Sequence, residues 1–422
     1  MHTFLPASLA GLTIPETATP VAPRTLSIWE ITSWILPMAP EHFRRVLAAE
    51  PHLPQGSAGG EGGTRWFTQA DLARLRAHFA TGSRKARYQP SRPLRAPLVA
   101  LTAPLGPMGR TTALLHLAVG AALSGYRILV IEGDAAGTLD RTLPVSPGHG
   151  GVARLTEVRQ GALSLIAQSA AGHLRRMNEA RLDRGEAPQP MDDRLTAALA
   201  LTAADLIRPT LWPGLDVMPL AVSALLGDVL IAGWRHALRG WQPSRGFAAG
   251  LEDLRPRYDL ILVDTPRGLG PMALSLLGAA DILLAPLPLP AAKGQGSALP
   301  HLTAGLQALA EAQALTETEA QSFARALGQT PAPPPPQQLL ILPTNAGPDT
   351  ARQMAGFAAK LGEVLLPEPL PEVEAVALGQ VAHLYDLDYR SIGRLAYAPL
   401  RQACDTACLA AIKTLTSFAA EP

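Results

Sequence analysis

Apolar residues along the chain fall into short continuous runs, and these predict strands buried in a parallel sheet. Such runs occupy 98–103, 215–220, 260–263, 282–286 and 339–344. A strand covered on both faces shows an unbroken apolar run of this kind, whereas a strand with one wet face alternates. Between the runs, helical patterns are expected at 203–206, 222–254 and 272–278, so strands and helices alternate as in an α/β protein.

The segment from 98 to 134 is the most informative of these units. An apolar strand leads into a Gly/Pro loop, a helix is expected from Arg110 to about Gly125, and a second apolar strand follows, ending in Glu132 and Asp134. This order is a βαβ unit with a phosphate-type loop at its first turn.

The loop contains several residue types that phosphate binding requires. Glycines let backbone N–H groups converge on phosphate oxygens, and a Ser or Thr hydroxyl can bind Mg²⁺. Gly106, Gly109, Thr111 and Thr112 stand at suitable positions, but position 110 is Arg where the usual pattern has Lys. An ordinary βα turn in a domain that binds no nucleotide is the alternative.

The sequence pattern near the N-terminus predicts a separate helical module over residues 26–82. Leu26–Trp34 and Glu41–Ala49 are expected to be helices, a Gly-rich turn follows at 56–63, and Thr68 is expected to cap a helix that ends at Phe79. Before this module, residues 1–25 show no periodicity and predict a disordered arm.

The phrase TRWFTQADLARLRAHF in this module resembles a segment of MerR-like winged helix-turn-helix domains. The resemblance implies that Arg44, Arg45 and Arg65 face DNA, and that Trp66 and Phe67 anchor the wing. A helical cap whose arginines are merely solvated is the alternative. The proline-punctuated linker at 83–97 is basic and has no acidic residue, so it is either a phosphate-contacting strap or a solvated spacer.

Composition limits the remaining interpretations. The 422 residues carry a formal charge of +1, so any nucleic-acid surface must be a local patch.

Cys404 and Cys408 lie one helical turn apart and are expected to be buried free thiols, as in a reducing cytoplasm. No membrane span or secretory signal is expected. Residues 331–336 predict a polyproline spacer, and an insertion near 144–200, poorly periodic and polar over 175–189, has no assigned role.

Several segments in this order resemble the ParA/MinD family of deviant Walker ATPases. LGPMGRTT is similar to the family's KGGVGKTT loop, with Leu105, Pro107 and Arg110 departing from it, and the stretch 258–290 follows the family pattern apart from Arg267. Residues 374–390 and the helices to 419 resemble RepA-type plasmid partition ATPases, which also carry a MerR-like domain before the core. The implied fold is a P-loop NTPase-like α/β domain over 98–422, with a mostly parallel sheet flanked by helices, preceded by a small winged helix-turn-helix domain.

The resemblance also implies roles for individual residues. Thr111 and Asp264 would hold Mg²⁺, Asp134 would orient the attacking water, and Arg110 would take the place of the catalytic lysine. The residues expected to contact ATP are Gly106, Met108, Gly109, Arg110, Thr111, Thr112 and Asn345. Because phosphoryl transfer depends on positioning and charge, the changes in the loop make efficient hydrolysis doubtful.

Two functions are therefore expected from the resemblance. In one, the protein is a cytoplasmic, nucleoid-associated partition ATPase that dimerises with ATP, binds DNA, is stimulated by a ParB/RepB-type partner and represses its own operon. In the other, it is a degenerate pseudo-ATPase that acts as a DNA-binding regulator or partition accessory protein. Leu105, Pro107 and Arg110 favour the second, whereas Thr111, Asp134 and Asp264 favour the first.

Overall fold

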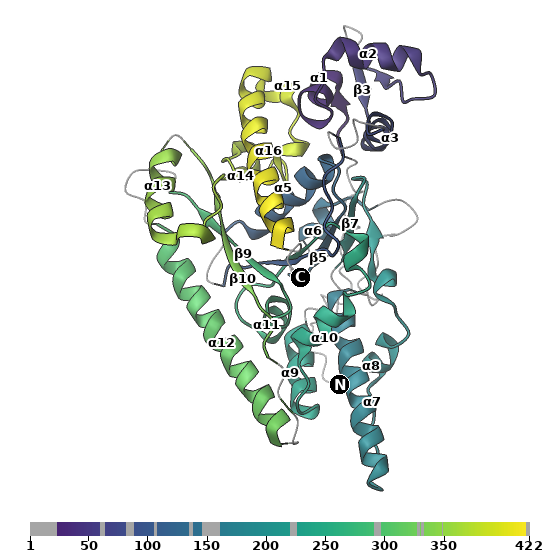
Figure 1. Cartoon of the computed structure of the whole chain (residues 1–422), viewed down its shortest axis with the longest axis vertical. Helices are drawn as coiled ribbons and strands as arrows, with labels where there is room; N and C mark the ends of the chain where they lie inside the picture. Colours follow the sequence, from purple (N-terminus) through teal and green to yellow (C-terminus); the bar gives the residue numbers. More distant parts are fainter. Residues whose placement is uncertain are drawn as a thin grey trace, which may run out of the picture.

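A seven-stranded sheet forms the centre of the described part of the chain (Figure 1). The computed structural model describes residues 23–59, 64–81, 88–104, 108–134, 138–145, 161–219, 226–290, 297–326, 330, 333–347 and 349–418. The strands lie in the order β10-β9-β4-β8-β5-β7-β6, and every pair is parallel except the edge pair of β6 and β7. Their bounds are Leu98–Leu101 (β4), Ile128–Glu132 (β5), Arg208–Pro209 (β6), Leu215–Met218 (β7), Leu260–Asp264 (β8), Ile282–Pro288 (β9) and Gln338–Thr344 (β10).

Helices cover both faces of this sheet. Successive strand residues point to opposite sides, and the apolar side chains on each side are buried by helices. In β4, Val99 and Leu101 belong to one hydrophobic cluster while Leu98 and Ala100 belong to another. The first cluster includes α5 (Arg110–Leu123) and α16 (Arg394–Ser417), and the second includes α7 (Ala162–Asp183), α9 (Gly227–Ala237), α10 (Pro243–Gly250) and α11 (Pro271–Leu277). This layered arrangement confirms the predicted α/β class.

The remaining helices of the described α/β part connect or pack beside these elements. They are α6 (Thr138–Thr142), α8 (Asp193–Ala198), η3 (Ala203–Leu206), η5 (Arg255–Arg257), α12 (Leu299–Ala326), α13 (Thr350–Leu361), η6 (Gly362–Val364), α14 (Glu374–Ala377), η7 (Leu384–Asp386) and α15 (Tyr389–Ile392). Of these, α8 packs on α7, and η7 packs on α5. None of the helices in the described ranges is both long enough and apolar enough to cross a membrane.

The N-terminal elements form a small sheet with helices beside it. Its strands are β1 (Leu26–Ser27), β2 (Ser57–Ala58) and β3 (Arg65–Phe67), paired antiparallel in the order β1-β3-β2, and its helices are α1 (Ile28–Glu30), η1 (Ile31–Ile35), α2 (Pro40–Ala49) and α3 (Gln69–Phe79). Thr68 caps α3 as predicted, in a capping box with Asp71. Figure 1 shows these elements at the end of the molecule where α15 and the start of α16 also lie.

This N-terminal group packs directly on the C-terminal helix. Trp29 meets Tyr389 edge to face with 5.0 Å between ring centroids, and the ring centroids of Trp34 and Tyr397 are 5.9 Å apart. Arg24 donates a 2.9 Å hydrogen bond to the Tyr397 hydroxyl. The N-terminal and C-terminal segments therefore share one hydrophobic cluster with helix α5.

Two predictions from the sequence need correction here, and a third region that had no assigned structure is now described in part. The helix expected over 26–34 begins as a strand, because Leu26 and Ser27 pair with Phe67 and Trp66. The stretch expected to be helical over 222–254 is broken into α9 and α10, and residues 220–225 lie outside the described residues. The region near 144–200 contains the long helix α7, whose inner face is buried from Ala162 to Leu174; residues 146–160 lie outside the description.

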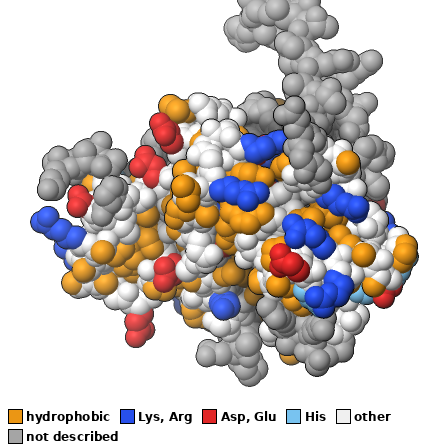
Figure 2. Space-filling model, turned by 90° about the horizontal axis from the view of Figure 1, so that it is seen from above, with side chains coloured by type: hydrophobic (Ala, Val, Ile, Leu, Met, Phe, Trp, Pro, Cys, Tyr) orange, Lys and Arg blue, Asp and Glu red, His pale blue; other side chains and the backbone are white. Residues whose placement is uncertain are grey.

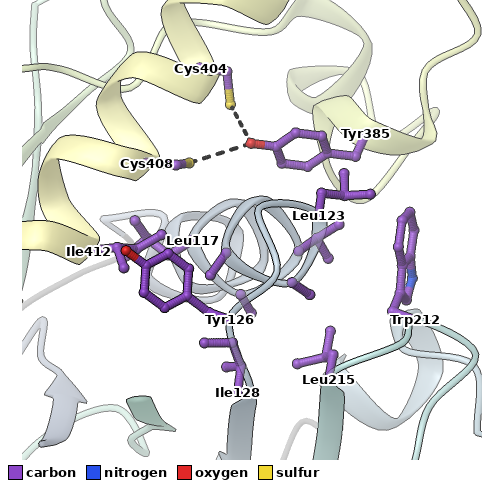
Figure 3. Close-up of a cluster of buried hydrophobic side chains, with 14 of the residues drawn as sticks. Leu117, Leu123, Tyr126, Ile128, Trp212, Leu215, Tyr385, Cys404, Cys408 and Ile412 are labelled. Carbon is purple, nitrogen blue, oxygen red and sulfur yellow. Dashed lines mark hydrogen bonds between the residues drawn. The ribbon is translucent and has the colours of Figure 1, made fainter. Parts of the chain in front are cut away.

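Two further predictions concern the chain ends. The arm over 1–25 is predicted to be disordered, and its residues 1–22 lie outside the described residues. At its end, Arg24 forms an ion pair with Glu30, with 2.6 Å between Nη2 and Oε1. Both cysteines of α16 are buried free thiols, as expected. The Tyr385 hydroxyl lies 3.6 Å from each sulfur, between α16 and α5, where Figure 3 shows these side chains packed with Leu117 and Ile412.

Candidate functional site

The candidate site lies at the carboxyl edge of the sheet, where β4, β5 and β8 end beside the start of α5. Ligands of open α/β sheets bind at this edge. Gly109 is the N-cap residue of α5 and has a left-handed conformation, with φ of 69°. Since no side chain caps this end of the helix, the first backbone N–H groups of α5 face this edge of the sheet. A glycine is suited to this position because other residues rarely adopt that φ.

Arg110 occupies the middle of the site. It is the first residue of α5 and only 6% of it is exposed. Its Nη2 donates to Asp134 Oδ2 at 3.0 Å, its Nη1 donates to the Pro266 carbonyl at 3.0 Å, and its Nε lies 3.6 Å from Asp264 Oδ1. In this conformation the guanidinium binds the acidic side chains that follow β5 and end β8.

Asp264 is the most deeply buried acid of the site. Its Oδ2 accepts a 2.7 Å hydrogen bond from the Thr111 hydroxyl, while its Oδ1 is buried and accepts no hydrogen bond within the described residues. Burial raises the pKa of Asp264 to about 6, although the Thr111 hydrogen bond and the charge of Arg110 act to lower that pKa. This oxygen faces the Arg110 Nε at 3.6 Å, so a positive charge already occupies the position beside it.

The donor set at this edge fits Mg²⁺. This ion prefers oxygen ligands and keeps several waters, so it needs only one or two protein groups. The Thr111 hydroxyl and the Asp264 carboxylate are both present, with Asp134 held nearby through Arg110. The same guanidinium also supplies a positive charge that balances these acids without any metal.

The other predicted ligands of the nucleotide are dispersed around this edge. Gly106, like Leu105 and Pro107, lies outside the described residues. The Met108 side chain is 5% exposed and packs with Ala103 and Leu287, so only its backbone could face a ligand. Thr112 is partly exposed in the first turn of α5. Asn345 is exposed just after β10, with a left-handed φ of 59°.

Glu132, the first acid of the predicted pair, interacts with the start of α6. It is fully buried, and its Oε1 accepts a 2.8 Å hydrogen bond from the backbone N–H of Leu139 in α6. It therefore stabilises the start of that helix. Asp134 alone of the two acids contacts Arg110.

Sequence reasoning missed a connection between this site and the C-terminal segment. His116 of α5 donates from Nδ1 to the Thr112 carbonyl at 2.8 Å and accepts at Nε2 from the backbone N–H of Leu384 at 3.1 Å. This pattern requires a neutral ring, and burial lowers the pKa of His116 accordingly. No sequence signal indicated the contact, because its partner is a backbone group far along the chain.

The residues predicted to contact DNA lie at the other end of α5, in the N-terminal group. Arg44 and Arg45 are exposed on α2, and Arg65 is exposed on β3. Arg65 donates to the Gln55 carbonyl at 2.9 Å, which fixes the direction of its guanidinium. Phe67 is buried against Phe43, with ring centroids 5.8 Å apart, and its role as the anchor of a wing stays a prediction.

The fold is an α/β fold of the ParA-like P-loop NTPase type. No family model matches the chain. It is 26% identical over 224 residues to Protein SopA of Escherichia coli K12, a match that covers 53% of this chain and 47% of SopA. It is also 26% identical over 245 residues to the "Putative replication protein A" of Sinorhizobium fredii NGR234, covering 56% and 51% of the two chains. The chain thus matches about half the length of these curated relatives.

A solved structure titled "Partition Protein" has the same fold. Its TM-score is 0.50 at 16% identity, and the match covers 86% of this chain and 90% of that one. The resemblance to ParA/MinD-type deviant Walker ATPases and RepA-type partition proteins, predicted from the sequence, is confirmed by these matches.

Proposed function

We propose that this protein is a ParA-like partitioning protein that binds ATP with Mg²⁺ at the carboxyl edge of the sheet. The observation that supports this most directly is the grouping of Thr111, Asp134 and Asp264 around the start of α5. These residues come from one helix and two strand ends, and Asp264 is fully buried, with an Oδ1 that accepts no hydrogen bond within the described residues and has the Arg110 guanidinium 3.6 Å away.

In this proposal the bound magnesium ion offsets the charge of the phosphates. Thr111 and Asp264 would hold the ion, and the N–H groups at the start of α5 would face the phosphates. Asp134 would orient water, and Arg110 would have to leave at least one carboxylate when the nucleotide enters. Release of Arg110 from a carboxylate is therefore part of nucleotide binding. Because a guanidinium stands where the usual pattern has a lysine, we expect slow hydrolysis.

We further propose that the active form is a homodimer that binds DNA through the N-terminal group, with Arg44, Arg45 and Arg65 at the contact surface. A ParB/RepB-type protein would be its partner, and the same surface would serve repression of its own operon. The exposure of all three arginines supports the DNA-contacting role.

A degenerate DNA-binding relative that lacks hydrolysis is the second candidate. It is favoured by the ion pairs of Arg110, which already neutralise Asp134 and Asp264. Calorimetric titration of the full chain with ATP, with and without Mg²⁺, separates the candidates when phosphate release is followed with and without duplex DNA. Magnesium-dependent binding with DNA-stimulated release supports the ATPase, and binding without release supports the second candidate. No binding at millimolar ATP contradicts a nucleotide site.

Arg110→Lys tests whether the guanidinium limits this site. A lysine is a point charge and cannot donate to Asp134 and Pro266 while lying beside Asp264, so the acids should be freed for the metal. We expect affinity for Mg-ATP to rise by about tenfold, which corresponds to about 1.4 kcal/mol. Arg267→Lys, which changes an arginine just beyond Pro266, is the matched control. Weaker binding by Arg110→Lys would show that the guanidinium itself contacts the nucleotide.

A further inference from the structure

A hollow in the N-terminal group brings together arginines from three separate elements. Arg44 comes from α2, Arg65 from β3 and Arg394 from the first turn of α16, and they line one hollow of about 560 Å³. Residues of α1, α2, β3 and α16 line the hollow, among them Glu41 and Trp29, and so does Gln55. Arg394 is separated from the other two by more than three hundred positions in sequence, so only the fold brings them together.

The charge of this hollow is largely uncompensated. Within the described part of the chain, neither Arg65 nor Arg394 has a carboxylate at ion-pair distance, and Arg44 pairs only with the exposed Glu41 at 3.6 Å. Exposed pairs of this kind contribute little and are readily exchanged for another anion. Among the described residues that line the hollow, Glu41 is the one acid, against three arginines.

Arg394 is held in place by aromatic rings. The carbon at the centre of its guanidinium lies 4.8 Å from the ring centre of Trp29 and 5.4 Å from that of Tyr389. A guanidinium stacked on rings keeps its N–H groups available at its edge, with less freedom to lose on binding. Arg65 is likewise oriented by Gln55.

Figure 2 shows the face of the molecule at this end, seen from above. Lys and Arg side chains gather there among hydrophobic ones, with fewer acidic side chains between them.

We infer that Arg394 is a DNA-contacting residue, so that the C-terminal helix completes the phosphate-binding surface of the N-terminal group. The inference rests on the proposed DNA binding of that group. Duplex DNA is the favoured ligand because guanidinium groups flank the hollow from α2, the wing and α16, which suits a phosphate backbone that follows the surface. An acidic protein segment is the other ligand that such charge could attract.

Arg394→Gln in the full chain tests this inference. Each phosphate contact contributes about 0.9 to the slope of log K against log salt, so its loss should lower affinity for a random-sequence duplex about eightfold near 0.1 M salt. The slope should fall in magnitude by about one. Arg394→Lys keeps the charge and should keep the slope. The matched control is Arg352→Gln, an exposed arginine in the first turn of α13, far along the chain from the N-terminal group.

The outcomes separate this inference from the proposed function. If the unchanged protein fails to bind duplex DNA at low salt, or binds polyglutamate in preference, then DNA binding itself is wrong and the inference falls with it. If Arg44→Gln and Arg65→Gln weaken binding while Arg394→Gln matches Arg352→Gln, only the role of Arg394 is overturned. Melting curves of each variant show whether the fold is retained, and Arg394→Lys gives the decisive comparison if Arg394→Gln is unstable.

Discussion

Asp264→Asn is expected to reduce magnesium-dependent ATP binding by at least about a hundredfold, or about 2.7 kcal/mol. The substitution keeps the size of the side chain and an oxygen for Thr111, but it removes the charge that the metal requires. Thr111→Ala should act in the same direction, since its hydroxyl lies 2.7 Å from Asp264. Calorimetric titration with ATP in the presence and absence of Mg²⁺ measures the loss directly.

Asp259→Asn provides the matched control for this prediction. Asp259 is a buried acid that precedes the amino end of the same strand, where it is paired with Arg127 at 2.7 Å. Its loss should destabilise the protein without changing nucleotide affinity. Equal affinities in the unchanged protein, Asp264→Asn and Thr111→Ala would show that the carboxyl edge is not the nucleotide site.

The central strands could be predicted from the sequence because their information is local. A continuous apolar run such as 260–263 has few alternatives to a buried parallel strand, and the acid that ends it must then lie at the carboxyl edge. The same reasoning failed for Leu26 and Ser27. A two-residue strand has no periodicity of its own, and these residues adopt it because Phe67 and Trp66 lie beside them.

The orientation of site residues was beyond sequence reasoning. The motif placed Arg110 in the loop, but the direction of its guanidinium depends on Asp134 and Asp264, which belong to other units of the sheet. Arg394 had no signal at all, since its neighbours in the hollow come from the opposite end of the chain. Packing between segments far apart in sequence determines both the orientation of Arg110 and the surroundings of Arg394. Composition and residue spacing carry no information about such packing.

The packing of the two chain ends yields the last prediction, Arg401→Ala. Arg401 is 1% exposed, donates to Asp405 at 2.8 Å, and lies over the rings of Tyr385 and Trp34 at 4.5 and 5.5 Å. Removing the guanidinium leaves the Asp405 carboxylate, 17% exposed, with the Tyr385 hydroxyl as its donor, so the free energy of unfolding should fall by about 3 kcal/mol, the lower end for a buried pair. Urea denaturation followed by circular dichroism measures this change.

Two further variants show whether the loss comes from the buried charge. Lys413→Ala removes an exposed cation from the same helix and should change the free energy of unfolding by less than about 0.5 kcal/mol. The double variant Arg401→Met, Asp405→Leu replaces the pair with apolar groups and should recover much of the stability lost in Arg401→Ala. Because three of the six tryptophans, Trp29, Trp34 and Trp66, belong to the N-terminal group, part of the change in tryptophan fluorescence should occur at a lower urea concentration in Arg401→Ala. A loss below about 1 kcal/mol in Arg401→Ala would mean that the pair does not hold the N-terminal group to the C-terminal helix.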